Sequence, residues 1–451
     1  MCNIVITNIL DTAKVILANK YGKRRGPDKE TIKIINNILF MHNLLSITGD
    51  NNEQPYINEN IVIIFNGEIY NYKYNSELEY IYKLYKCGIE NMNQLDGEYA
   101  IIIVDFEIEM LYMIHDTFGT KPLYIGIDNN NKFCISSYPS VSTNLKFSTI
   151  AKIPPNCVMS LNLRDYEIKL ECELMRWDLN QYKMDFNDFN IALEAAILKR
   201  ATTDKKILVN MSSGYDTGTI CCVLNKLGIK YNTATILGIE NKDIIRARNE
   251  INRQNINEFQ KIYEVKQSEA EYYKAIMKEK CENIEFMTWD KTKQTYALKL
   301  DVYNDPACIG LVKIYENIGD KIKIVLSGSG ADEIMSDYSI NGNGLSISTC
   351  FNGIFPNNLS DIFPKNCMDK NCIWKHFYYS TQELYLFKEE SICGGYGLEG
   401  RYPYLDKNLI QEFLWLNVNL KNKKYKMPLN NYMTSHNYPF IEEKKGFNPF
   451  S

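Results

Sequence analysis

Short apolar runs and polar turns alternate through the first third of the chain. Residues 61–65, 100–106 and 158–163 are apolar runs of the length that favours buried strands. Between the first two runs, residues 77–85 carry their apolar side chains at helical spacing. The pattern predicts a β-rich part with at least one helix packed against it.

From about residue 185 the pattern changes. Helical patterns of about 10–15 residues alternate with short β-branched runs at residues 207–209, 233–237 and 322–326. This alternation is typical of a parallel sheet whose strands are joined by crossover helices. Because 451 residues also exceed one ordinary domain, we expect two domains, over residues 2–175 and 185–451.

Composition and charge restrict the class of protein. Hydrophobic residues make up 45% and charged residues 24%, as in globular proteins with packed cores. The net charge of -4 gives no reason to expect nucleic acid or a membrane surface as partner, and no apolar run is long enough for a membrane span. The 13 cysteines lack zinc or disulfide-framework spacing, which favours reduced thiols in the cytoplasm.

Cys2 is a candidate nucleophile. Removal of Met1 would expose its α-amine, which titrates near about pH 7.7 and can take the thiol proton at neutral pH. Asn66 and Gly67 follow a strand-like run and can donate amide N–H groups to an oxyanion on an attacked carbonyl. Each feature alone is more typical of a turn or a buried small residue, whereas together they indicate attack on a carbonyl.

Five motifs occur in one order in this part of the chain: MC (residues 1–2), RGPD (25–28), FNGEIYN (65–71), LDGEYA (95–100) and D-x-FG-x-KPLY (116–124). In this order they resemble the class II glutamine amidotransferase domain of asparagine synthetases. The resemblance implies an αββα sandwich, two sheets flanked by helices, with an N-terminal nucleophile. It also implies glutamine hydrolysis, in which Cys2 attacks the side-chain amide, Asn66 and Gly67 form the oxyanion hole, and Asn66, Gly67, Glu68 and Glu77 bind glutamine.

Two positions depart from this family pattern. The family has an arginine for the α-carboxylate of glutamine in an H-x-R-L-S-I stretch, and Leu44 stands in its place. Glu77 replaces an aspartate for the α-amine. Loss of a charged hydrogen-bond partner costs about 1.5–3 kcal/mol. We therefore expect an intact nucleophile and oxyanion hole beside a weakened clamp for glutamine.

The second part contains two loops that follow predicted strands. SSGYDT (residues 212–217) opens a helical pattern and is not a Walker loop, but small hydroxyl-bearing residues at such a place favour phosphate binding. It resembles the S-G-G-x-D-S pyrophosphate loop of enzymes that cleave ATP to AMP and pyrophosphate. LSGSGADE (residues 326–333) resembles the family stretch L-S-G-E-G-[SA]-D-E, and residues 397–406 and 444–447 match further family stretches.

This second resemblance implies an α/β domain with a parallel sheet, similar to the adenine-nucleotide α-hydrolases. It implies that Lys426 stabilises the adenylation transition state and that Asp216 and Asp332 hold Mg²⁺, which prefers such hard oxygen ligands. The residues implied to bind ATP are Met211, Ser212, Ser213, Gly214, Asp216, Thr217, Leu237, Ser327 and Gly328.

The sequence defines the carboxylate substrate that ATP activates less clearly than it defines the two sites. Asparagine synthetases adenylate the side chain of aspartate, and ammonia then attacks it. Ser329 stands where the family has a glutamate, and serine is no general base near neutral pH. Residues 305–309 have no arginine nearby to hold an α-carboxylate.

Three functions therefore stay open. The motif order and the two-domain length favour a glutamine-dependent asparagine synthetase. The departures at Leu44 and Ser329 favour a related amide ligase that acts on another carboxylate. The third is a degenerate member that only binds nucleotide, against which the retained Cys2, Asp216 and Lys426 speak. In each case the expected partners are small molecules, and a homodimer is expected only by analogy.

Overall fold

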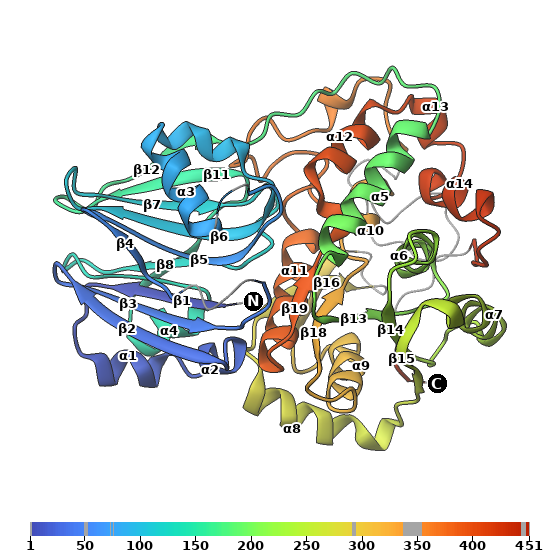
Figure 1. Cartoon of the computed structure of the whole chain (residues 1–451), viewed down its shortest axis with the longest axis horizontal. Helices are drawn as coiled ribbons and strands as arrows, with labels where there is room; N and C mark the ends of the chain where they lie inside the picture. The colour runs from blue at the N-terminus through green and yellow to red at the C-terminus, as the bar shows by residue number, and fades with distance from the viewer. Residues whose placement is uncertain are drawn as a thin grey trace.

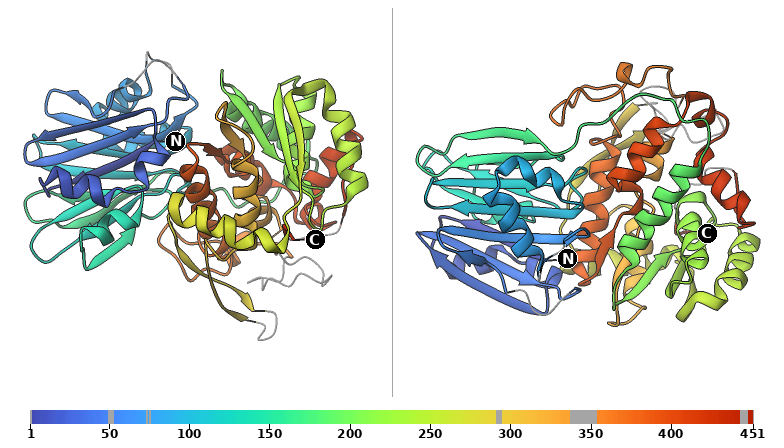
Figure 2. Two further views of the ribbon diagram at one scale, coloured as in Figure 1. Left: turned by 90° about the horizontal axis from the view of Figure 1, so that it is seen from below. Right: turned by 45° about the horizontal axis from the view of Figure 1, so that its top comes forward.

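The computed structural model describes residues 2–48, 53–72, 74, 76–290, 295–336, 354–442 and 448–450, so the predicted match at residues 444–447 lies outside the described residues. Two α/β parts lie side by side, and the amino-terminal end of the chain lies where they meet (Figure 1, Figure 2). None of the helices in these ranges is long and apolar enough to cross a membrane.

The first part contains two antiparallel sheets. Strands predicted over residues 61–65, 100–106 and 158–163 are confirmed within the second of them. The first sheet has the order β10 (Thr149–Lys152), β8 (Tyr124–Ile127), β9 (Phe133–Ser136), β1 (Asn3–Thr7), β3 (Ile38–Leu44) and β2 (Lys29–Ile35). The second has the order β12 (Ile168–Glu173), β11 (Cys157–Asn162), β7 (Met110–His115), β6 (Gly97–Asp105), β5 (Ile61–Ile69) and β4 (Tyr56–Asn58).

Alternating side chains of these strands build three apolar layers. Ile4 of β1 and Ile64 of β5 belong to the layer between the two sheets, whereas Val5 packs outward with Val15 and Val141. Helices cover both outer faces, as the predicted αββα sandwich requires. They are α1 (Thr12–Ala18), α2 (Gly22–Arg25), α3 (Glu77–Lys86), α4 (Pro139–Asn144) and the 3-10 helix η1 (Ile89–Gln94).

The second part contains the predicted parallel sheet. Its order is β15 (Ile256–Tyr263), β14 (Tyr231–Ile236), β13 (Lys206–Asn210), β18 (Ile322–Leu326) and β19 (Glu399–Arg401), and every neighbouring pair is parallel. Successive residues of β13 and β14 are buried, which shows that both faces of the sheet are covered. A hairpin, β16 (Glu285–Asp290) and β17 (Thr295–Asp301), stands apart from this sheet.

Helices connect and cover these strands. Because parallel strands need long crossovers, a helix follows β13, β14 and β18 at their carboxyl ends. The helices are α5 (Asn187–Ala201), α6 (Tyr215–Lys226), α7 (Lys242–Asn252), α8 (Ala270–Lys280), α9 (Pro306–Tyr315), α10 (Ala331–Met335), α11 (Thr381–Gly395), α12 (Lys407–Trp415), α13 (Val418–Lys421) and α14 (Met427–Ser435).

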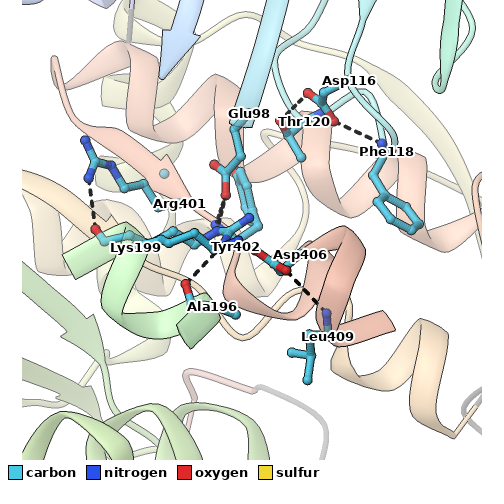
Figure 3. A network of polar contacts seen from close by, with 12 residues as sticks. Glu98, Asp116, Phe118, Thr120, Ala196, Lys199, Arg401, Tyr402, Asp406 and Leu409 are labelled. Carbon is cyan, nitrogen blue, oxygen red and sulfur yellow. Dashed lines mark hydrogen bonds and ion pairs between the residues drawn. The ribbon is translucent and has the colours of Figure 1, made fainter. Parts of the chain in front are cut away.

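A buried network of charges joins the two parts. Glu98 of β6 accepts from Arg200 Nε of α5 at 2.5 Å and from the backbone N–H of Tyr402 at 2.8 Å (Figure 3). Arg200 also pairs with Asp406, 3.0 Å away, and Lys199 pairs with the same carboxylate at 2.5 Å. Glu98, Arg200 and Asp406 are at most 2% exposed. The ion pair between Glu98 and Arg200 therefore forms only when the two parts are in contact.

A second group of charges lies closer to Cys2. Arg25 of α2 pairs with Glu390 of α11 at 2.5 Å, and Arg25 Nε donates to the carbonyl of Cys2 at 2.7 Å. Lys121 lies 3.1 Å from the other oxygen of Glu390 and donates to the carbonyl of Gly400 at 2.6 Å. The start of β1 is thus tied to α11 of the second part.

Replacing Arg200 with methionine is expected to destabilise the protein strongly. Glu98 and Asp406 would remain buried without this cation, and breaking one side of a buried pair costs about 3–5 kcal/mol. Chemical denaturation of the R200M variant measures this change in the free energy of unfolding. The exposed ion pair of Arg246 and Asp243 offers a matched control, since R246M should change stability little. Equal stability of the two variants would contradict the network's role.

Candidate functional site

Cys2 lies at the boundary of the two sheets, directly before β1. Its thiol is buried, and its backbone nitrogen donates to Asn66 Oδ1 of β5 at 2.8 Å. Since β1 and β5 belong to different sheets, packing of the sandwich brings together two residues 64 positions apart. Burial raises the pKa of the Cys2 thiol, so the sulfur needs a base to become a nucleophile.

Asn66 and Gly67 present amide groups beside Cys2. Asn66 Nδ2 is buried and has no hydrogen-bond partner among the described residues. Gly67 has φ +141°, and a side-chain carbon at this position would lie 2.0 Å from the carbonyl oxygen of Glu98. Only glycine fits there. The pair can therefore supply donors for an oxyanion on a carbonyl attacked by Cys2.

Glu68 and Glu77 form an acidic corner next to this pair. The Thr48 hydroxyl donates to Glu68 at 2.5 Å, and Arg401 Nη2 lies 3.4 Å from the same carboxylate. Glu77 begins α3 and accepts from the backbone N–H of Ile69 at 2.7 Å. Burial, and then repulsion by Glu68, raise the pKa of Glu77 well above its ordinary value. Such a corner favours a cationic group such as an α-amine.

Leu44 is the last residue of β3 and supplies no charge. In the register of the first sheet it lies directly opposite Lys29 of β2, and Asn3 lies opposite Asn43. Residues opposite one another share a face of the sheet, so Lys29 lies on the same face as Leu44. The Lys29 side chain is 46% exposed, with its amine 3.7 Å from Glu53. The sequence pattern gave no reason to select this lysine.

The SSGYDT loop follows β13 and leads into α6, and hydrogen bonds inside the protein hold it in place. Ser212 N–H donates to Thr217 Oγ1 at 2.9 Å, Ser213 N–H to Glu240 at 2.6 Å, and Arg248 donates to the carbonyl of Gly214 at 2.9 Å. The backbone N–H groups of Ser212 and Ser213 therefore already have partners within the protein. The first turn of α6 has no side-chain cap, so its N–H groups remain suited to an anion.

The loop after β18 lies against the first loop. A side-chain carbon on Gly328 would lie 2.8 Å from Asp216 Cβ, so glycine permits the close approach. Because β14, β13 and β18 are adjacent parallel strands, their carboxyl ends bring Leu237, Met211 and Ser327 to one edge of the sheet. The predicted ATP residues therefore gather at one edge.

Lys426 joins the two acidic residues of this edge. Its amine pairs with Asp216 and lies 2.5 Å from Asp332 Oδ1, to which Tyr425 also donates at 2.7 Å. Burial opposes the charge of Lys426, but the two carboxylates outweigh it and raise its pKa well above the ordinary value. Within the described residues no group of three or more His, Cys, Asp or Glu side chains could hold a metal. Two carboxylates suit Mg²⁺ bound chiefly to substrate phosphates and water.

Several residues of these sites carried no signal in the sequence. Glu389 accepts from the Ser329 hydroxyl at 2.8 Å, although 60 residues separate them. Lys388 lies 2.6 Å from Asp305 Oδ2, which supplies the cation that the sequence around residues 305–309 lacks. Arg248 and Glu240 hold the first loop. These residues make contacts between segments that are distant in the sequence, so no local motif could have identified them.

Two family models match this chain. A glutamine amidotransferase domain matches residues 1–151, and an asparagine synthase domain matches residues 188–390. The chain belongs to the asparagine synthetase family. Among its relatives are proteins named as glutamine-hydrolysing asparagine synthetases from Methanocaldococcus jannaschii (26% identical; 86% of this chain, 71% of the relative), Gallus gallus (24%; 80% and 66%) and Oryza sativa subsp. japonica (24%; 91% and 68%). At this identity, the residues that differ from the family pattern decide how each site of this member works.

Proposed function

We propose that this chain is a glutamine-dependent asparagine synthetase. It hydrolyses glutamine to glutamate and ammonia, adenylates aspartate with ATP while releasing pyrophosphate, and forms L-asparagine and AMP. One observation carries the proposal: Arg25 connects the carbonyl of Cys2 at the first site to Glu390 of α11, the helix that also faces the ATP loops. Both matched domains are thus built as one unit.

At the first site we assign the chemistry to Cys2, Asn66 and Gly67. Removal of Met1 would free the Cys2 amine, whose nitrogen already lies 2.8 Å from Asn66 Oδ1. The amine takes the thiol proton, and the sulfur attacks the side-chain amide of glutamine. The unpartnered Asn66 Nδ2 and the Gly67 N–H stabilise the oxyanion, while Glu68 and Glu77 hold the α-amine.

At the second site we assign ATP to the two loops and to the start of α6. Met211, Leu237, Ser327 and Gly328 contact the adenosine part, and the loop of Ser212, Ser213, Gly214 and Thr217 bears the phosphates. Asp216 and Asp332 would hold Mg²⁺, which would neutralise phosphate charge. Lys426 is positioned between them to stabilise charge that develops during adenylation.

Lys388 supports aspartate as the acceptor. Its amine lies 2.6 Å from Asp305 at the start of α9, and an α-carboxylate needs a cation as its partner. A different carboxylate remains the second candidate, favoured by the family departure at Ser329. We also propose the domain division 2–175 and 185–451, a homodimer, and a cytoplasmic location, where the free cysteines of the described residues would stay reduced.

Pyrophosphate release measured with a panel of carboxylates tests this function. With magnesium-ATP and glutamine, release is expected with aspartate and not with other amino acids or sugar acids. The C2A variant should lose release driven by glutamine and keep release driven by ammonium, because the two reactions use different sites. Mass spectrometry should show the chain without Met1.

Cys87 provides a matched control, since this cysteine is exposed and belongs to neither of the two proposed sites. The C87A variant should behave as the wild type with either nitrogen donor. Release with another carboxylate but not with aspartate would favour the second candidate. Binding of magnesium-ATP without release for any carboxylate would contradict an enzymatic function.

Lys29 is our proposed partner for the α-carboxylate of glutamine. Cys2 directly precedes β1, whose Asn3 lies opposite Asn43, so Cys2, Leu44 and Lys29 fall on three neighbouring strands of one sheet. Adjacent strands are about 4.8 Å apart. A glutamine whose amide lies at Cys2 would extend its α-carboxylate across Leu44 toward β2, within the reach of a lysine side chain.

The K29M variant is therefore expected to raise KM for glutamine about tenfold, since one charged hydrogen bond contributes about 1.5 kcal/mol or more. The rate with saturating ammonium should not change. Steady-state kinetics with each donor measures both. Lys23 is an exposed lysine of the same part, and K23M serves as the control. An unchanged KM for glutamine in K29M would remove Lys29 from the clamp.

A further inference from the structure

Glu389 of α11 makes a contact that the family pattern does not predict. The Ser329 hydroxyl donates to Glu389 Oε1 at 2.8 Å. The resemblance predicts a glutamate at the position that Ser329 occupies. A carboxylate still lies beside the loop, but it belongs to Glu389 of α11. Position 329 itself cannot provide a proton acceptor near neutral pH.

Glu389 lies at the edge of the sheet where ATP is proposed to bind. Ser329 follows Gly328, where an added side-chain carbon would lie 2.8 Å from Asp216 Cβ. Asp216, Gly328, Ser329 and Glu389 are all partly exposed, whereas Ser213 and Glu390 are buried. Glu389 therefore lies beside the second loop and is less buried than its neighbour Glu390 on the same helix.

The acidic and basic neighbours of Glu389 are already paired. Lys388 pairs with Asp305, Glu390 pairs with Arg25 and Lys121, and Asp216 pairs with Lys426. Within the described part of the chain Glu389 forms no ion pair. Burial raises its pKa, and hydrogen bonds from Ser327 and Ser329 oppose this only in part. A carboxylate in such surroundings is a stronger base than one in water.

We propose that Glu389 is the proton acceptor of the amide-forming step, which makes it a catalytic residue of the proposed asparagine synthetase. This inference rests on the proposed function. Ser329 is then a positioning residue that orients the carboxylate through its hydroxyl.

The step balances in atoms and charge. The lone pair of ammonia forms a C–N bond with the acyl carbon of the adenylated carboxylate, and the nitrogen becomes positively charged. Glu389 takes one proton from this nitrogen. The bond between the acyl carbon and the phosphate oxygen breaks, and its electron pair leaves with AMP. The products are the amide, AMP and protonated Glu389, which returns its proton to water.

The E389Q variant tests the proposal, because glutamine can still accept the hydrogen bond from Ser329 but cannot take a proton. Formation of asparagine from ammonium is expected to fall about 100-fold or more. Exchange of labelled pyrophosphate into ATP in the presence of aspartate should stay at the wild-type rate, since adenylation precedes the attack. E383Q is the matched control, because Glu383 belongs to the same helix and pairs with Lys152 instead.

A second variant exchanges the serine and the glutamate that contact each other. The double substitution S329E with E389S places a glutamate on the loop and a serine on α11, and it should restore much of the amide-forming rate that E389S alone loses. The rescue tests the proposal even if E389Q does not fold. A carboxylate with only a structural role on α11 could not be replaced by a carboxylate on the loop.

Amide formation at the wild-type rate in E389Q would overturn the inference while leaving the proposed function intact. An equal loss of exchange and amide formation, without rescue by the double substitution, would also overturn it and assign Glu389 a structural role. Absence of exchange in the wild type with aspartate would instead overturn the proposed function, and the inference with it.

Discussion

The arrangement of both sites depends on the buried ion pairs between the two parts of the molecule. Arg25 holds the backbone of Cys2 and the carboxylate of Glu390, while Glu98 holds Arg200 and the backbone of Tyr402. Charges this deeply buried are costly unless every partner is in place. The interface therefore permits one relative placement of the two parts, and that placement brings the Cys2 end of β1 to the helix that faces the ATP loops (Figure 1).

This network also gives several of the sequence motifs a structural role. Arg25 of RGPD, Glu98 of LDGEYA and Lys121 of KPLY pair with residues of the second part. Residues 397–406 supply the opposite side through Arg401, which lies 3.4 Å from Glu68, and through the backbone N–H of Tyr402, which donates to Glu98. Residues of these motifs therefore form the contact between the two parts, which no single segment of the sequence reveals.

The strands and the parallel sheet could be predicted because alternation and apolar runs are local properties of the sequence, whereas the αββα sandwich was implied by the resemblance of the five motifs. The β18 strand has the predicted bounds, and β5 continues four residues past the predicted 65 because NGEI (residues 66–69) keeps pairing with β6. The replacements for missing charges could not be predicted. Lys29 lies opposite Leu44 on the neighbouring strand, and Glu389 is 60 residues away from Ser329 in the sequence. Each contact therefore depends on how the chain folds in space.

The proposed function requires the two sites, joined through this interface, to act on the same nitrogen. The direct measurement is the ¹⁵N content of the product amide when glutamine labelled in its side-chain amide reacts with aspartate and magnesium-ATP in excess unlabelled ammonium. We expect the product to carry more label than the free ammonium pool, because ammonia passes from Cys2 to the second site before it mixes with solvent. A product labelled only as highly as the pool would contradict the claim.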